Sequence, residues 1–276
     1  MNDEAGRTAW TCETCGVQGE PMTAPSEGCP ICLDERQYVG WSGQTWLAPD
    51  EIRRNREIIF RNEDGVTTMV LNPGLGINQR AFLIPHAAGH IMWECLATVT
   101  DNALERLANM GGVTAIAISH PHFYAAMVDW SEALGGVPVY LHARDRDWVQ
   151  RASPTLNFWD GEALDLADTI RLVRLPGHFD GSTGLLWSAG PRPEGSLFPG
   201  DAVQVAMDRR FVTFMYSYPN AIPLDPDTLA ALRSRLDPLE FEDVFGFSTG
   251  RQIIGDAKAR VDQSFERYAD AITSGQ

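Results

Sequence analysis

Histidine and aspartate residues of the chain stand at spacings that suit metal binding. His120 and His122 are one residue apart and directly follow the apolar run 113–118, which Gly111 and Gly112 precede. Such a bounded apolar run is typical of a buried strand, and in the loop after it both imidazoles can turn toward one ion. Because an isolated pair of this kind is more often two partly exposed histidines, a metal site needs further ligands.

Two later residues supply those ligands. His178 follows Leu-Pro-Gly and Asp201 follows Phe-Pro-Gly, so each is expected where a strand passes into a loop. Imidazole nitrogens and a carboxylate oxygen are ligands that Zn²⁺ accepts, and Fe or Mn accepts the same set less selectively. We therefore predict an active-site metal held by His120, His122, His178 and Asp201.

Four of the five cysteines form two Cys-x-x-Cys pairs, Cys12/Cys15 and Cys29/Cys32, with thirteen residues between them. Two such pairs place four thiolates around Zn²⁺, and Gly16 permits the tight turn beside the sulfurs. The intervening loop has no core of its own, so a metal must hold it together. Disulfides, free thiols or a rubredoxin-like iron are the alternatives. Because a closed four-cysteine site leaves no position for a substrate, we predict a structural zinc.

The order and spacing of these motifs resemble those of the metallo-β-lactamase-fold superfamily. His120 and His122 match the start of its His-x-His-x-Asp-His motif. His178 matches the later motif histidine, and Asp201 matches the bridging aspartate. The resemblance covers the chain from about residue 50 to its end. It implies an αββα sandwich, a fold of class α/β (α+β), which a small zinc-ribbon module precedes here.

The departures from the family pattern fall on one of its two metal sites. Tyr124 stands where the motif has its Asp, and Ala125 stands where it has the second-site His. The segment 244–251, where the last metal His should follow a strand, contains no His. The resemblance thus implies a mononuclear site. Glu94 takes the place of a buried carboxylate that supports the metal loop in the family.

The patterns divide the chain into a zinc ribbon with a docking strand at 1–46 and a metallo-β-lactamase-like domain at 47–276. Residues 34–46 are expected to form a strand and turn that pack on the larger domain. Such ribbons also precede this fold in a subgroup of the superfamily that the sequence resembles, which implies that the ribbon docks near the active-site face. The aromatic-rich segment 211–218 is expected either in the core or along the pocket. Strands are predicted over 57–60, 67–71, 79–84, 90–93, 113–118, 137–141, 169–175, 184–187, 196–198 and 243–247. Helices are predicted over 49–56, 100–110, 124–134, 227–235 and 256–272.

This metal site would hold Zn²⁺ with room for water, whose pKa the ion lowers to around 7. The expected reaction is hydrolysis of an ester, thioester, lactone or amide of a small molecule. Asp201 would bind the metal, accept a hydrogen bond from the water, or do both. For Tyr124 we consider two roles: its hydroxyl stabilises an oxyanion, or its ring fills the volume that the missing ligand vacates.

Two other classes of function compete with hydrolysis. The loss of second-site residues is also what decay to a binding protein would produce, with only the structural zinc retained. Fe-based redox chemistry occurs in family members with carboxylate-rich dinuclear sites, and the missing ligands argue against it. Metal content discriminates between a hydrolase and a binding protein, because only the hydrolase must hold an ion at His120, His122 and His178.

Composition narrows the partners and the compartment. The 276 residues carry 37 acidic and 22 basic side chains, a formal charge of −15, and such a field repels phosphate backbones. We therefore expect no nucleic-acid partner. No run reaches the ~18 apolar residues that cross a bilayer, and residues 1–7 do not show the basic and apolar stretches of a signal peptide. With cysteines used as metal-binding thiolates, the chain is expected to be cytoplasmic. The oligomeric state is open.

Overall fold

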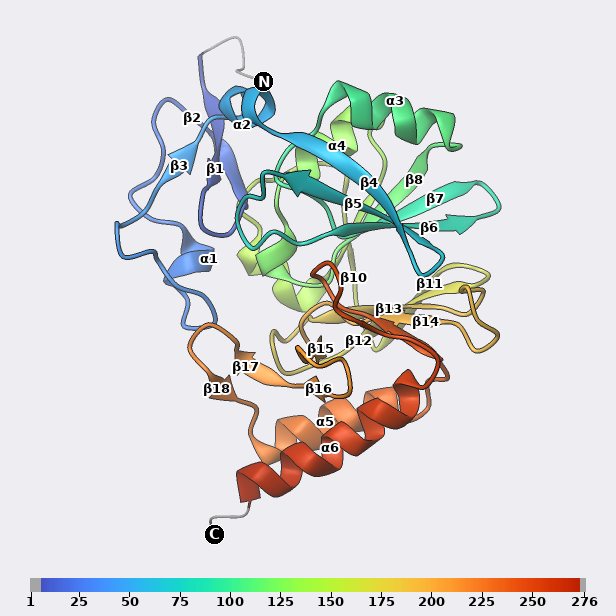
Figure 1. Cartoon of the computed structure of the whole chain (residues 1–276). Helices are drawn as coiled ribbons and strands as arrows, with labels where there is room; N and C mark the ends of the chain where they lie inside the picture. Colours follow the sequence, from blue (N-terminus) through green and yellow to red (C-terminus); the bar gives the residue numbers. More distant parts are fainter. Residues whose placement is uncertain (1–5, 274–276) are drawn as a thin grey trace.

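Two β-sheets pack face to face in the computed structural model, which describes residues 6–273 of the chain. Helices cover the two outer faces (Figure 1). On one side they are α3 (Asp101–Asn109) and α4 (Met127–Ala133); on the other they are α5 (Pro226–Leu236) and α6 (Ala257–Thr273). The predicted αββα sandwich is thus confirmed. None of the helices in this described part is long and apolar enough to cross a membrane.

The first sheet has seven strands, in the order β10-β9-β8-β7-β6-β5-β4. The strands from β4 to β7 form an antiparallel meander, whereas those from β7 to β10 are parallel. Because parallel strands end at the same edge, the residues after β7 and β8 come close together. The strands are β4 (Glu57–Glu63), β5 (Val66–Asn72), β6 (Ala81–His86), β7 (Gly89–Trp93), β8 (Val113–Ala117), β9 (Val139–His142) and β10 (Leu156–Trp159).

The second sheet has six strands, in the order β11-β12-β13-β14-β19-β20. All neighbours are antiparallel except β14 and β19. These strands are β11 (Ala163–Ala167), β12 (Ile170–Arg174), β13 (Thr183–Trp187), β14 (Ser196–Phe198), β19 (Asp243–Phe245) and β20 (Gln252–Ile253). Two short hairpins follow β14, namely β15 (Gln204–Val205) with β16 (Val212–Thr213) and β17 (Met215–Ser217) with β18 (Ile222–Pro223).

Aromatic side chains fill the space between the sheets. Phe82 of β6 meets Phe198 of β14 edge to face, with ring centroids 4.9 Å apart. Phe198 in turn stacks on Phe245 of β19 at 5.1 Å. All three rings are buried, so the ends of β6 and β14 are held at a fixed separation. The loop that follows β14 therefore starts from a rigid base.

The four-cysteine segment, residues 8–47, lies along one edge of the sandwich, beside both sheets (Figure 1). It contains a three-stranded sheet in the order β2-β1-β3 and a short helix, followed by the helix α2 (Pro49–Asn55). These elements are β1 (Thr8–Cys12), β2 (Gln18–Met22), α1 (Pro30–Leu33) and β3 (Trp46–Leu47). Its four cysteines belong to the same buried cluster as residues of the first sheet and its helices, such as Leu96 and Met127. The segment thus shares a core with the larger domain.

Some predicted elements differ in extent. Of the strand and turn expected over 34–46, only Trp46 lies in a strand. The helix expected over 124–134 is shorter: α4 begins only at Met127, because Ala125 before it has a φ of 40°. The short 3-10 helix η1 (Pro121–Phe123) lies before the expected start. The edge strand β11 was not predicted, and three of its five side chains are partly exposed.

Candidate metal centre

Loops from both sheets bring the four predicted ligands together. His120 and His122 follow β8 of the first sheet, whereas His178 and Asp201 follow β12 and β14 of the second. One ligand atom from each lies within 4.8 Å of the others. All four side chains are buried. The centre therefore exists only where the two sheets face each other.

The distances between the ligand atoms match those around a single ion. His178 Nε2 lies 3.1 Å from His122 Nδ1, and His120 Nε2 lies 3.5 Å from Asp201 Oδ2. His178 Nε2 is 3.9 Å from the same oxygen. Nitrogen and oxygen ligands about 2.0–2.1 Å from a tetrahedral ion lie roughly 3.3 Å from each other. The residues thus fit a metal ion.

Hydrogen bonds outside the centre fix the orientation of the imidazoles. His178 Nδ1 lies 2.9 Å from the carbonyl oxygen of Tyr216. Because a carbonyl only accepts, Nδ1 carries the proton and Nε2 keeps its lone pair toward the centre. His120 Nδ1 is 2.7 Å from Ser119 Oγ. His120 Nε2 and Asp201 Oδ1 are buried without a hydrogen-bond partner among the described residues, as atoms poised to bind an ion would be.

Burial sets the charge state of these groups. It lowers the pKa of His120 to about 3 and that of His178 to about 4, because desolvation penalises the imidazolium. Burial also raises the pKa of Asp201 to about 6. At neutral pH the imidazoles are therefore neutral and the carboxylate is mostly ionised. These are the protonation states that metal ligands require.

Two backbone features hold the ligand loops against each other. Glu94, directly after β7, accepts a hydrogen bond from Ser119 N through Oε2 at 3.2 Å, next to His120. Burial raises the pKa of Glu94 to about 8. Gly200 has a φ of 58°, and a Cβ there would lie 2.5 Å from Ser119 Cβ. Only glycine therefore lets the Asp201 loop approach the His120 loop this closely.

A cavity of about 270 Å³ opens onto the centre. His122, His178 and Asp201 line it, together with residues of the four-cysteine segment and of the aromatic-rich segment 211–218. The other lining residues are Thr14, Arg36, Gln37, Tyr38, Gly76, Ile77, Gln204, Tyr218, Pro219 and Phe247. The expectation that the four-cysteine segment lies near the active-site face is thus confirmed. The segment 211–218 is divided, since Tyr218 lines the cavity and Phe214 is fully buried in the core.

The positions expected for second-site ligands hold other side chains. Phe247, in the segment that lacks the last metal His, lines the cavity and packs on Phe123 with ring centroids 5.3 Å apart. Ala125 is buried. Tyr124 is fully buried, and its hydroxyl donates to the carbonyl oxygen of Asp145 at 3.3 Å. Within residues 6–273, His, Cys, Asp and Glu gather into two groups that suit a metal, and neither uses these positions.

Three residues at the cavity escaped the sequence analysis. Arg36, Gln37 and Tyr38 form part of its wall although they lie far from every ligand in sequence. No motif marks them, because their place depends on how the four-cysteine segment folds back over the second sheet. The available signal was their position within four to six residues of Cys32, in a segment already expected to dock there.

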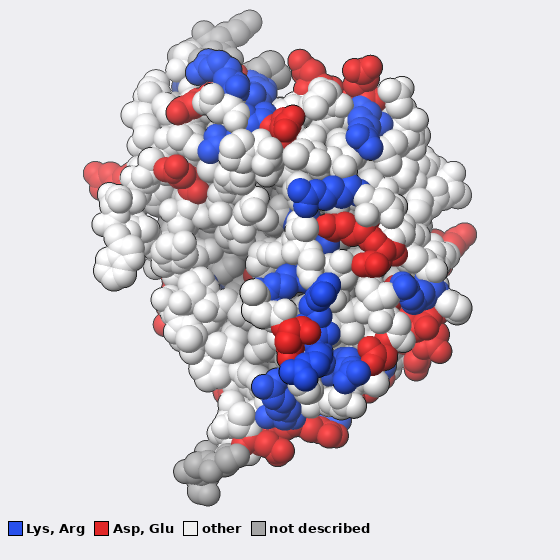
Figure 2. Space-filling view, viewed as in Figure 1, with Lys and Arg blue, Asp and Glu red and all other residues white. Residues whose placement is uncertain are grey.

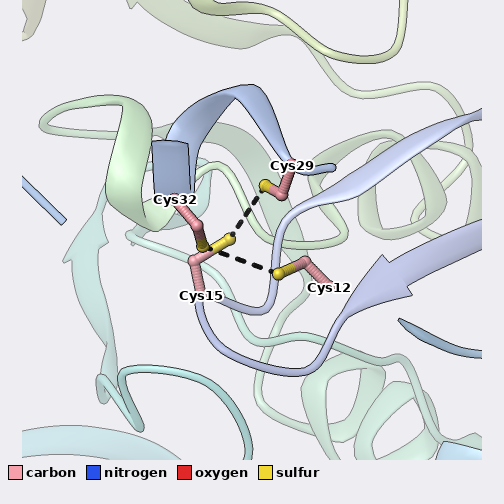
Figure 3. Close-up of side chains that lie close together, drawn as sticks. All are labelled: Cys12, Cys15, Cys29 and Cys32. Atoms are coloured by element: carbon pink, nitrogen blue, oxygen red, sulfur yellow. Dashed lines mark hydrogen bonds between the residues drawn. The ribbon is translucent and has the colours of Figure 1, made fainter. Parts of the chain in front are cut away.

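The other group is the four cysteines, all buried and all free of disulfides (Figure 3). Cys12 Sγ lies 3.6 Å from Cys32 Sγ, and Cys15 Sγ lies 3.7 Å from Cys29 Sγ. Four sulfurs about 2.3 Å from a tetrahedral zinc ion lie roughly 3.8 Å apart, so the cluster fits a metal. Hydrogen bonds from the neighbouring thiols hold the pKa of Cys12 well below its ordinary value, which favours a thiolate.

Comparison with known proteins agrees with this geometry. No protein-family model matches the chain. The uncharacterized protein YmaE of Bacillus subtilis (strain 168) is 37% identical over 268 residues, which cover 96% of this chain and 97% of that protein.

Solved metallo-β-lactamases share the fold. The DIM-1 enzyme superposes with a TM-score of 0.56 at 13% identity, covering 78% of this chain and 98% of its own. The VMB-1 structure gives a TM-score of 0.56 at 13% identity, covering 79% and 99%. FIM-1 from Pseudomonas aeruginosa, in its mono-zinc form, gives 0.53 at 12% identity, covering 76% and 95%. With a His/His/His/Asp group and a four-cysteine cluster that each suit a metal, the chain has the fold of the metallo-β-lactamases and belongs to the family of YmaE.

Proposed function

We propose that the chain is a metal-dependent hydrolase of a small carbonyl substrate, with a mononuclear zinc site at His120, His122 and His178 beside Asp201. The observation that carries this proposal is the convergence of unpaired ligand atoms at the base of a cavity of about 270 Å³. Purely structural sites are closed, whereas this one is open to a cavity. The fold and the metal site together support a hydrolase-type function.

Zinc bound there would supply a nucleophilic hydroxide near neutral pH and would polarise a carbonyl oxygen. The chain's own residues do the rest. The Tyr216 carbonyl keeps His178 in the tautomer that binds through Nε2. Asp201, with an unpaired Oδ1, accepts a proton or a hydrogen bond from the attacking water.

The shape and charge of the molecule limit the substrate. A cavity of about 270 Å³ falls just below the roughly 300–1,000 Å³ of sites for drug-sized ligands. The acidic composition, with a net charge of −15, disfavours polyanions. Asp and Glu side chains also lie beside the Lys and Arg side chains on the face in Figure 2, and Arg210 and Arg260 pair with Asp208 and Asp256. We therefore propose esters, thioesters, lactones or amides of small molecules, and neither nucleic acid nor a membrane as partner.

A mononuclear site is part of the proposal. Phe247 and Ala125 offer no ligand where a second ion would need one. FIM-1, which shares the fold, has been crystallised in a mono-zinc form, so the scaffold accommodates a single ion. For the four cysteines we propose a structural zinc, with iron as the alternative that fits the same sulfur distances. Free, metal-poised thiols favour a cytoplasmic location.

Elemental analysis of zinc, iron and manganese tests the proposal. The intact protein should hold two metal ions per chain, and the double variant His120→Ala/His178→Ala should hold one. The intact protein should then hydrolyse at least one member of a panel of esters, thioesters, lactones and amides, and the double variant should not. A single ion that the double variant retains would instead support the alternative of a decayed binding protein with only the structural zinc.

A further inference from the structure

One side chain of the four-cysteine segment reaches the loop that carries His178. This His178 loop, residues 175–182, connects β12 to β13. Arg36 Nη1 donates to the carbonyl oxygen of His178 at 3.3 Å, across 142 residues of sequence. The guanidinium also lies over the ring of Phe179, 3.9 Å from its centroid. Arg36 thus contacts both His178, through a hydrogen bond, and Phe179, through a cation–π interaction.

Arg36 supports the hydrogen-bond partner of His178 as well. The ring of Tyr216 lies 5.3 Å from the guanidinium carbon, and the backbone carbonyl of Tyr216 accepts the hydrogen bond from His178 Nδ1. Arg36 therefore contacts both the backbone of His178 and Tyr216, the residue that accepts the proton of the His178 ring. A shift of Arg36 would therefore move His178 Nε2, the ligand atom.

Asp34 holds Arg36 in this position. Its carboxylate accepts from Arg36 Nε at 2.6 Å and from Nη2 at 3.0 Å, a bidentate pair in which both side chains are less than one-fifth exposed. With Nη1 on His178, each guanidinium nitrogen already has an acceptor. Arg36 is therefore arranged to position protein groups, although it lines the cavity.

The contacts of Arg36 with the His178 loop depend on the position of the cysteine cluster. Asp34 immediately follows α1, which contains Cys32. Asn220, from the second sheet's side, donates to the carbonyls of Glu35 and Gln37 at 2.7 and 3.0 Å and so secures the same stretch. A metal bound by the four cysteines would fix Cys32, and the short connection from Cys32 would then fix Asp34 and Arg36.

The other cysteine pair is held by the first sheet. The backbone of Cys15 and Gly16 lies against Gly76, where a Cβ would come within 2.6 Å of Cys15. Gln18 N donates to Ala125 O at 3.1 Å, close to the loop of His120 and His122. The cysteine cluster thus links two pairs. Cys12 and Cys15 lie beside the loop of His120 and His122, and Cys29 and Cys32 precede Arg36, which contacts His178.

We propose that Arg36 is a positioning residue, through which the four-cysteine segment holds the His178 loop in its metal-binding conformation. The inference rests on the proposed metal site at His120, His122 and His178. It adds that this site is incomplete without the four-cysteine segment. The segment is then a part of the active site and serves more than its own stability.

The test measures metal affinity at the histidine site, independently of turnover. Arg36→Met removes every donor at similar length, and Arg36→Lys keeps the charge without the fork. Arg267→Met is the matched control, because Arg267 is an exposed arginine that stacks on Phe211 at 4.6 Å, on a helix that carries no ligand. Cobalt is titrated against a competing chelator. Its thiolate charge-transfer band reports the cysteine centre, and its ligand-field bands report the histidine centre.

We expect Arg36→Met to bind cobalt at the histidine centre about 10–100-fold more weakly, the range for lost outer hydrogen bonds, with altered ligand-field bands. The thiolate band and the control variant should match the wild type, and Arg36→Lys should fall between. If Arg36→Met does not fold, Asp34→Asn, which releases one side of the fork, should show a smaller shift in the same direction. Wild-type affinity in the variants that fold, or an equal loss in Arg267→Met, would overturn the inference. Failure of the wild type itself to bind at the histidine centre would instead defeat the proposed function.

Discussion

At the scale of single residues, Asp201 differs from the three histidines because its carboxylate offers two oxygens. Its Oδ2 lies 3.5 Å from His120 Nε2 and 3.9 Å from His178 Nε2. Its Oδ1 is buried and has no hydrogen-bond partner among the described residues. The carboxylate therefore has one oxygen near the other ligands and a second oxygen free to accept a proton.

Asp201→Asn tests whether Asp201 acts in proton transfer while the three histidines hold the ion. We expect the variant to keep its metal, because three imidazoles remain, and to lose about 10²–10⁴-fold in kcat, the usual contribution of a positioned acid or base. Metal content and kcat are measured together, with the exposed Asp208→Asn as control. Loss of the active-site ion from Asp201→Asn would show instead that the carboxylate is an indispensable ligand.

The role of Tyr124 as a catalytic residue stays a prediction, and the geometry favours the alternative that the ring fills space. The hydroxyl is buried against the Asp145 carbonyl. We expect Tyr124→Phe to change kcat/KM by less than about threefold, whereas loss of an oxyanion donor costs about 10²–10³-fold. Stability should fall by about 1 kcal/mol, because the carbonyl loses its donor. Urea unfolding and steady-state kinetics measure both; a large drop in kcat alone would restore the catalytic role.

At the scale of elements, the site is made by loops that leave the ends of strands. The grouping of the predicted ligands and of the four cysteines was predictable because each motif is local. His178 and Asp201 each follow an apolar segment and a glycine, His120 and His122 follow an apolar run, and the cysteines form two Cys-x-x-Cys pairs. The strand that precedes His178 was predictable in the same way, from the apolar and polar residues of 169–175. The cavity wall at Arg36 and Tyr218 was not, since it depends on contacts between segments far apart in sequence. The sequence 34–46 has the aromatic residues of a strand, yet its backbone is instead tied to loops of the second sheet.

Close approach of two such loops depends on Gly200. We expect Gly200→Ala to lower stability by about 2–3 kcal/mol and to weaken metal binding, because the new Cβ would overlap Ser119 in addition to straining the backbone. Gly250→Ala is the control, since Gly250 also has a positive φ, 77°, but open space around it. The control should cost about 1–2 kcal/mol and leave metal binding unchanged. Equal effects of the two substitutions would show that the loop contact is unimportant. Urea unfolding and chelator competition give the two quantities.

At the scale of the whole molecule, the four cysteines lie in the same buried cluster as the first sheet and its helices. A ribbon that merely preceded the larger domain would unfold separately. A ribbon that shares its core should unfold with it. The boundary at residue 46 stays a prediction, and we expect both sides of it to unfold as one cooperative unit.

Removal of the cysteine metal distinguishes these cases. In the His120→Ala/His178→Ala background, a chelator with reductant should lower the midpoint of a single thermal transition by about 10–20 °C. This corresponds to a loss on the order of 5 kcal/mol at the roughly 2–4 °C per kcal/mol of a protein this size. Calorimetry measures it, with the chelator-free sample as control. Two separate transitions, with the larger one unmoved, would show that the ribbon is an independent module.

The placement of the ligands along the chain has a consequence during synthesis. The four cysteines lie within the first 32 residues, whereas the histidine centre waits for Asp201. At ~5–20 residues per second, the interval between the two events is on the order of ten to thirty seconds. The thiolates therefore meet the cell's metal pool first, on a nascent chain that has no second sheet. The proposed histidine centre has all four of its ligands only once synthesis has passed Asp201, so we expect it to take up an ion later than the cysteines do.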